Sequence, residues 1–261
     1  MTPLLTVAAA LSMPALSIAG VLSEAKVLSS RIVGGSMAKP GQFPALVAIE
    51  VGGVQNCGGT LLGPNLVLTA GHCVRGHLTN TLTVRAGSLT RVEGGITVGV
   101  SSYKIHPRYY QPKFDHDLAV VHLASSIARG ESIDYGNLAA AGTDVAAGST
   151  VTVAGWGWTR NSDTATTTAL LYASIPVMDR ATCATHYAGE SLEITQTMIC
   201  AGMKGRVSCK GDSGGPVYDA SGRQIVGVIA WGKQCAENGH PAVFVRVGKY
   251  RDWIEQNSGR S

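Results

Sequence analysis

The chain carries few charges and few aromatic side chains. Of its 261 residues, 15% are Asp, Glu, Lys or Arg and 6% are aromatic, whereas 45% are hydrophobic, so a core must be built mainly from aliphatic side chains. The net charge of +4 is modest, and no run of Lys and Arg occurs. Surfaces that bind nucleic acid need clustered basic residues, so nucleic acid is not expected as a partner.

Long apolar runs are also missing. After the N-terminal residues, no segment has the 18 or more consecutive apolar residues that a membrane-spanning helix needs. Residues 1–19 are mostly apolar and end in Ser17-Ile18-Ala19, a small-x-small sequence typical of signal-peptidase cleavage. A membrane anchor is the alternative, which Pro3, Pro14 and the shortness of the run disfavour. We expect a signal peptide over 1–19 and a secreted, extracellular protein with no membrane partner.

The six cysteines show no Cys-x-x-Cys spacing. The sequence therefore does not favour a zinc site, and we expect neither a metal nor another cofactor. Six cysteines in a secreted chain indicate disulfides instead, although fifteen pairings are possible. No Asn-x-Ser/Thr sequence occurs, so N-glycosylation is not expected.

Helical periodicity is scarce, whereas short β-prone runs recur between clusters of Gly, Asn, Ser and Pro. Strands at this spacing predict an all-β barrel or sandwich. Asp179 is expected to cap a short helix through Tyr187, and a second helix is expected over about 249–256. Ala139–Ser149 is interpreted as a crossover between two halves. The predicted strands are Ala45–Val51, Thr60–Thr69, Leu82–Ala86, Ile96–Ile105, Asp117–Leu123, Thr150–Ala154, Leu170–Val177, Ile225–Trp231 and Ala242–Val247.

Three short motifs carry chemistry. Lys210-Gly211-Asp212-Ser213-Gly214-Gly215-Pro216 encloses a serine in glycines, which predicts a strained turn that exposes one hydroxyl. Upstream, Thr69-Ala70-Gly71-His72-Cys73 supplies a histidine, and the segment from Phe114 to Val121 places acids before an apolar strand. Histidine titrates near neutral pH and can take a proton from serine, while a carboxylate can orient the imidazole.

A fourth motif, Arg31-Ile32-Val33-Gly34-Gly35, looks like a zymogen cleavage site. With these motifs in the order His, Asp, Ser, the chain resembles the trypsin/chymotrypsin family of serine endopeptidases. Over Ser36 to Gly248 it looks most similar to secreted fungal trypsin-like members. The resemblance implies an all-β fold of two six-stranded antiparallel β-barrels, with the active site in the cleft between them and a short C-terminal helix. It further implies a propeptide over 20–31 and a protease domain over 32–261, with barrels at roughly 32–145 and 146–248.

The same resemblance implies the site residues. His72, Asp117 and Ser213 would form the catalytic triad, because only Asp117, and not Asp115, directly precedes Leu118-Ala119-Val120. The backbone N–H groups of Gly211 and Ser213 would form the oxyanion hole. Three disulfides are implied, Cys57–Cys73, Cys183–Cys200 and Cys209–Cys235.

Activation is also implied by the family. Cleavage after Arg31 would free the amino group of Ile32, which would then pair with Asp212. An external protease with basic specificity would make this cut.

The substrate pocket departs from the trypsin-like pattern. Trypsin-like members have an Asp six residues before the catalytic Ser, where this chain has Val207. Gly232 would leave the pocket mouth open, and Ala242, where a Gly is usual, would narrow the pocket. We expect chymotrypsin-like cleavage after Phe, Tyr, Leu or Met, with an elastase-like preference for small aliphatic residues as the alternative. The implied substrate-binding residues are Val207, Ser208, Lys210, Ala230, Trp231, Gly232 and Ala242.

The leading hypothesis is thus a secreted serine endopeptidase. Two alternatives stay open, a catalytically weak homologue that acts as a binding protein and a disulfide-linked β lectin or adhesin. The expected partners are protein or peptide substrates, the activating protease and protein inhibitors, and the chain is expected to be a monomer.

Overall fold

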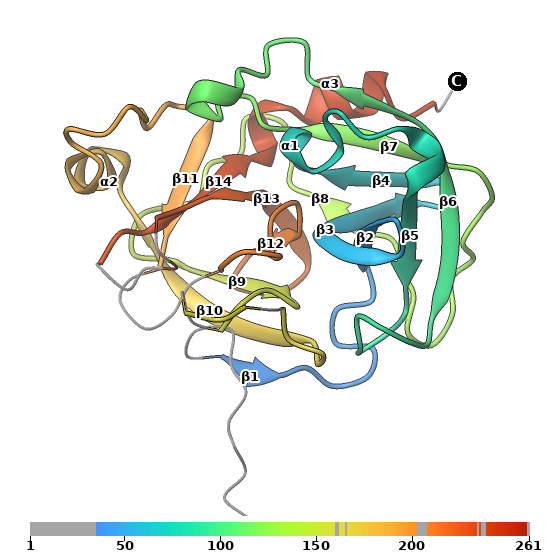
Figure 1. Ribbon diagram of the computed structural model, residues 1–261. Coiled ribbons are helices and arrows are strands. Elements are labelled where there is room, and N and C mark those ends of the chain that lie inside the picture. Colours follow the sequence, from blue (N-terminus) through green and yellow to red (C-terminus); the bar gives the residue numbers. More distant parts are fainter. Residues whose placement is uncertain are drawn as a thin grey trace, which may run out of the picture.

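Two closed sheets lie side by side in the computed structural model (Figure 1). The structure describes residues 35–159, 162–164, 166–202, 208–233, 235 and 239–259. The predicted signal peptide, the propeptide with Arg31, the new terminus at Ile32 and the pocket residue Val207 lie outside these ranges.

The first sheet is a closed barrel in the order β2-β3-β4-β7-β6-β5, and all its pairings are antiparallel. Alternation explains its strands: Leu82, Val84 and Ala86 are buried in β5, while Thr83 and Arg85 between them are half-exposed. Its strands are β2 (Leu46–Val51), β3 (Val54–Gly63), β4 (Leu66–Thr69), β5 (Leu82–Ala86), β6 (Ile96–Ile105) and β7 (Ala119–Leu123).

The second barrel has the order β10-β11-β14-β13-β12-β9 and closes where β9 pairs with β10. Two short strands join its outside. β1 (Ser36–Met37) pairs with β10, although it precedes the first barrel in sequence, and β8 (Asn137–Leu138) pairs in parallel with β13. The six barrel strands are β9 (Thr150–Gly155), β10 (Leu171–Met178), β11 (Met198–Ala201), β12 (Pro216–Tyr218), β13 (Gln224–Trp231) and β14 (Ala242–Arg246). The predicted two-barrel fold is confirmed.

Some predicted elements need correction. The single strand expected over Thr60–Thr69 is two strands, β3 and β4, because the chain reverses at Pro64 and Asn65 and the halves pair with each other. β1, β8, β11 and β12 were not predicted, since strands of two to four residues carry too little alternation.

Helices are short. α2 (Arg180–His186) begins after Asp179, whose side chain accepts the N–H of Thr182, as the predicted cap requires. α3 (Arg251–Gln256) follows the 3₁₀ turn η4 (Val247–Lys249) and lies against the first barrel, where Ile254 joins its core. The remaining turns of helix are α1 (Gly71–Val74), η1 (Thr79–Thr81) and η2 (Gln111–Lys113). None of the helices in the described ranges has the length and apolarity to cross a membrane.

Candidate active site

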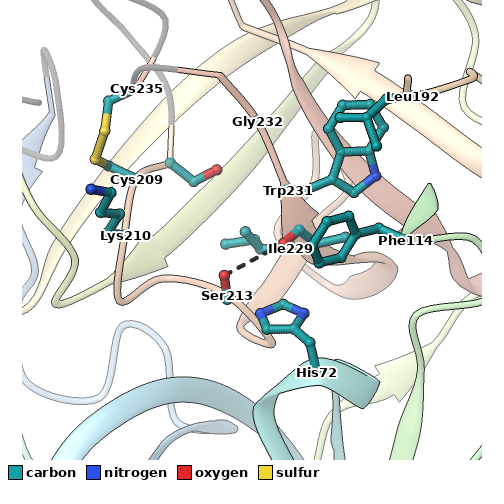
Figure 2. A pocket seen from close by; sticks show the side chains of 12 residues that line it. His72, Phe114, Leu192, Cys209, Lys210, Ser213, Ile229, Trp231, Gly232 and Cys235 are labelled. Carbon is teal, nitrogen blue, oxygen red and sulfur yellow. Dashed lines mark hydrogen bonds between the residues drawn. A yellow bond between two sulfur atoms is a disulfide. The ribbon is translucent and has the colours of Figure 1, made fainter. Parts of the chain in front are cut away.

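A cavity of about 340 Å³ opens between the two barrels, with His72 and Ser213 on its wall (Figure 2). His72 comes from α1 of the first barrel, and Ser213 from the turn before β12 of the second. Figure 2 shows Phe114, Leu192 and Trp231 on one side of this hollow and the Cys209–Cys235 disulfide on the other. The site therefore exists only where the two barrels meet.

Asp117 holds His72 at two points. One carboxylate oxygen accepts the His72 backbone N–H at 2.8 Å, and the other lies 2.6 Å from ring Nδ1. Asp117 is fully buried, whereas the His72 side chain is 23% exposed. A carboxylate on Nδ1 makes that nitrogen the donor and leaves Nε2, which lies 3.7 Å from Cys73 Sγ, as the nitrogen that can accept a proton.

The turn around Ser213 is possible only because Gly214 follows it. Gly214 has φ +81°, and a Cβ there would lie 2.2 Å from Thr69 Oγ1 and 2.5 Å from the Gly58 carbonyl oxygen. The turn thus packs directly onto β3 and β4 of the first barrel, and Gly58 donates its N–H to the Ser213 carbonyl at 2.7 Å.

Ser213 Oγ is aimed at the carbonyl of Ala230, at 3.5 Å, rather than at His72 (Figure 2). This contact is long and weak, so rotation about χ1 can redirect the hydroxyl. Nucleophile and base often tighten their hydrogen bond only when substrate is present.

The peptide between Lys210 and Gly211 is held by a backbone hydrogen bond that sets the direction of the Gly211 N–H. The carbonyl of Lys210, which belongs to the same peptide unit, accepts a hydrogen bond from the backbone N–H of Trp158 at 2.8 Å. Because N–H and C=O point in opposite directions across a trans peptide, the Gly211 N–H points away from Trp158. Gly211 has φ +94°, and a Cβ there would lie 2.6 Å from Thr166 Cγ2, so a side chain would not fit.

Asp212 points the opposite way from Ser213, into the protein. It is 1% exposed, and its carboxylate accepts the N–H groups of Gly157 at 2.7 Å and Cys209 at 2.9 Å. Among the ion pairs of the described residues, none involves Asp212. Burial raises the pKa of Asp212 to about 6, the direction expected for a buried carboxyl without a counter-charge.

Asp115, the alternative acid, serves another purpose. It accepts the hydroxyl of Thr197 at 2.6 Å and lies 3.7 Å from His116, without contacting His72. His116 in turn bonds the hydroxyl of Tyr250 at 2.7 Å. These contacts tie the segment before Asp117 to the second barrel and to the approach to α3.

The pocket wall is mostly apolar. Ser208, Lys210, Ala230, Trp231 and Gly232 all line the cavity, and no acidic side chain is among its described lining residues. Lys210 reaches the rim with its Nζ 4.3 Å from the centre of the Trp158 ring, a cation–π contact.

Ala242 lies behind Gly232. A Cβ built on Gly232 would be 4.0 Å from the Cβ of Ala242, so the two small residues face each other. Ala242 itself is 2% exposed and belongs to the core of the second barrel.

Sequence reasoning missed three lining residues, Phe114, Leu192 and Ile229. Phe114 has φ +49°, a left-handed conformation that turns the chain just before Asp117, and its ring meets His72 edge-on at 6.0 Å between centroids. Leu192 comes from the loop between α2 and β11. No periodicity marks a loop residue as part of a cleft wall, although Phe114 lies within the quoted acidic motif.

The cysteines form the disulfides Cys57–Cys73, Cys183–Cys200 and Cys209–Cys235. Cys57 and Cys73 lie beside His72, but their sulfurs are joined to each other and are not thiolate ligands for a metal.

Comparison with known proteins shows which family and which proteins this chain is similar to. The family model described as Trypsin matches residues 32–254. Trypsin beta of Drosophila erecta is 34% identical over 250 residues, which cover 95% of this chain and 97% of that protein. Trypsin alpha of Drosophila melanogaster is 36% identical over 227 residues, covering 87% of each chain. Trypsin Blo t 3 of Blomia tropicalis is 36% identical over 228 residues, covering 86% of this chain and 85% of its own. These relatives come from flies and a mite, so the likeness to fungal members stays a prediction.

Proposed function

This chain belongs to the trypsin family of serine endopeptidases, and from that premise we propose that Ser213, His72 and Asp117 hydrolyse peptide bonds through an acyl-enzyme. Ser213 Oγ attacks the carbonyl carbon while His72 Nε2 takes its proton. His72 then protonates the leaving amine, and water enters by the same route to release the acid. The double contact between Asp117 and His72, beside an open cleft that holds Ser213, is the observation that carries this proposal.

The N–H groups of Gly211 and Ser213 stabilise the oxyanion of each tetrahedral intermediate. The orientation of the Lys210–Gly211 peptide supports this role, because its N–H is turned away from Trp158. Loss of one such donor costs roughly 3–4 kcal/mol of barrier in comparable sites.

Cleavage after Arg31 activates the enzyme. The freed ammonium group of Ile32 binds Asp212, whose buried carboxylate accepts two N–H groups but has no cationic partner among the described residues. A buried charge without a partner is costly, so insertion of the new terminus beside Asp212 is energetically favourable. The activator is an outside protease that accepts a basic residue, because a pocket with Val207 offers no negative charge to Arg31.

The residue before the cut is apolar. The described wall of the cavity holds apolar side chains and no carboxylate, and the sequence puts Val207 where trypsin-like members have an Asp. An apolar side chain gains about 25 cal/mol for each Å² removed from water, whereas a buried Lys or Arg would lose its hydration and find no counter-ion. We infer chymotrypsin-like cleavage after Phe, Tyr, Leu or Met. Elastase-like cleavage after small aliphatic residues is the second candidate. It would follow if Gly232 and Ala242, which face each other, make the pocket too shallow for a large side chain.

The test compares kcat/KM for matched peptides with Phe, Leu, Ala or Arg before the scissile bond. Phe or Leu should be best. If Ala is best, the elastase-like candidate holds, and if Arg is best, the apolar pocket is wrong. Labelling of Ser213 by a fluorophosphonate probe separates an active enzyme from a catalytically weak binding protein, which would not react.

We also propose secretion, directed by residues 1–19. The three disulfides support it, since they persist in oxidising compartments. Recovery of the protein from the medium of expressing cells, and its retention inside them after deletion of 1–19, is the result expected.

A further inference from the structure

A buried glutamine on β3 joins the first barrel to the turn that carries the oxyanion hole. Gln55 is 6% exposed and stands at a bulge, where Ile49 of β2 pairs with Cys57 but Glu50 pairs with Gln55, so that Asn56 is left over. Bulges redirect side chains at the edges of barrels and beside active sites. Here Asn56 is exposed and Gln55 turns inward.

The side-chain amide of Gln55 reaches across 156 residues of sequence. Its Nε2 donates to the carbonyl oxygen of Gly211 at 2.8 Å, and also to the carbonyl of Cys57 at 3.2 Å. Gly211 lies in the turn that leads to Ser213, so a residue of the first barrel directly holds a backbone group of the second.

Gly211 needs such restraint. A glycine can adopt many backbone conformations, and its N–H must point at one place in the cleft to bind an oxyanion. The preceding peptide is held by Trp158, which donates to the Lys210 carbonyl at 2.8 Å. The following peptide is held by Gln55 through the Gly211 carbonyl. With both flanking carbonyls bound, Gly211 keeps φ near +94° and its N–H keeps its direction.

Within the described residues, the oxygen atom of the Gln55 side-chain amide makes no comparable contact. Gln55 Oε1 is buried and without a hydrogen-bond partner in the described part of the chain. A buried acceptor without a partner costs free energy, so an apolar side chain of similar shape would suit this position better if only packing mattered. The hydrogen bond that Nε2 donates to Gly211 therefore explains why an amide side chain stands at this position.

We propose that Gln55 is a positioning residue for the oxyanion hole, acting on the oxyanion only through Gly211. The inference rests on the proposed function, in which the Gly211 N–H binds the oxyanion. Because an N–H group binds the charged oxyanion of the transition state more strongly than the neutral carbonyl of the substrate, misplacing the Gly211 N–H should lower kcat with little change in KM.

Gln55→Met tests the proposal in the full chain after activation with trace trypsin. Methionine keeps the length and volume of the side chain but removes the donor. We expect kcat to fall about tenfold and KM to stay within about twofold. The affinity for a peptide aldehyde, which forms an oxyanion on Ser213, should fall about as much as kcat.

Thr60→Val is the matched control. Thr60 is also buried in β3, and its hydroxyl likewise has no partner in the described structure. Its methyl group lies against Gly136, where a Cβ would be 2.6 Å away, and no hydrogen bond among the described residues joins its side chain to the catalytic turn. Its variant should match the wild type in kcat, KM and aldehyde affinity.

Gln55→Glu adds a second measurement, the pH dependence of kcat, which would not differ from that of Gln55→Met if Gln55 served only the stability of the fold. Ionised glutamate can only accept, and it would repel the Gly211 carbonyl, whereas protonated glutamate can donate to it. The ratio of its kcat to the wild-type kcat should therefore rise as pH falls, while the same ratio for Gln55→Met stays flat.

Failure of the proposed function and failure of the role proposed for Gln55 would give different results. An inactive wild type, or a Ser213→Ala variant that keeps activity, would refute the proposed function itself. An active wild type with unchanged kcat in Gln55→Met, or with lowered kcat but unchanged aldehyde affinity, would overturn only the role of Gln55.

Discussion

At the scale of single residues, the proposed mechanism depends on one oxygen atom, the hydroxyl oxygen of Ser213. Ser213→Ala removes the nucleophile from a half-buried turn and opens no core cavity. We expect kcat to fall by about 10⁴-fold or more, with the melting temperature nearly unchanged. Amidase assays with thermal unfolding measure both. Ser174→Ala, at an exposed position of β10, should leave activity intact. Residual activity in Ser213→Ala above that of a mock purification would contradict the triad.

The proposed specificity also depends on one residue, Val207. Val207→Asp places a carboxylate where trypsin-like members have one, so an Arg side chain would gain a counter-ion in the pocket. We expect kcat/KM for an Arg peptide to rise at least about 100-fold and that for a Phe peptide to fall. Val207→Leu, which changes size without charge, should not raise the Arg rate. An equal rise in both variants would mean that charge is not the cause.

At the scale of elements, the turn before β12 fits against β3 and β4 with no space for a methyl group. Gly214→Ala would combine a left-handed backbone with a Cβ at 2.2 Å from Thr69 Oγ1. We expect a loss of about 3 kcal/mol or more in the free energy of unfolding, and loss of activity.

Gly222→Ala is the control that separates these two causes. Gly222 has φ +71°, but a Cβ added there would meet nothing within 4 Å, so the strain is similar and the clash is absent. Its variant should lose only about 1 kcal/mol in urea unfolding. Equal losses in the two variants would show that close packing of the turn is not what matters.

At the scale of the whole molecule, we expect the carboxyl group of Asp212 to couple stability to pH. Its pKa is raised to about 6 from 3.8, so between these pH values the folded, uncleaved chain (the proposed precursor) keeps a proton that the unfolded chain releases. The free energy of unfolding of the precursor should therefore fall as pH rises from about 4 to 6, by up to about 3 kcal/mol from this group.

Two comparisons isolate this effect. Asp212→Asn should lose this part of the pH dependence, because its side chain does not titrate. After cleavage at Arg31, the ammonium group of Ile32 should supply the missing counter-charge, so the activated enzyme should gain stability over the precursor as pH rises. Thermal unfolding of the three proteins at pH 4.5 and 7.5 measures these differences. Parallel curves for the precursor and Asp212→Asn would refute the assignment.

Sequence by itself determined the alternating strands and the chemistry-bearing motifs. β5 and β6 have the predicted bounds, because in both the β-prone run ends at turn residues. The Asp179 cap was equally local, since it depends on one side chain and a backbone N–H three residues on. Such features could be predicted because the residues that make them are neighbours along the chain.

Only the tertiary structure decided what meets across the two barrels. Pairing of β1 with β10, the entry of Phe114 and Leu192 into the cleft wall, and the bond from Gln55 to Gly211 all join segments far apart in sequence. The physical reason is that a polar group or an apolar side chain on a loop finds its partner through barrel closure and packing, which no local pattern encodes.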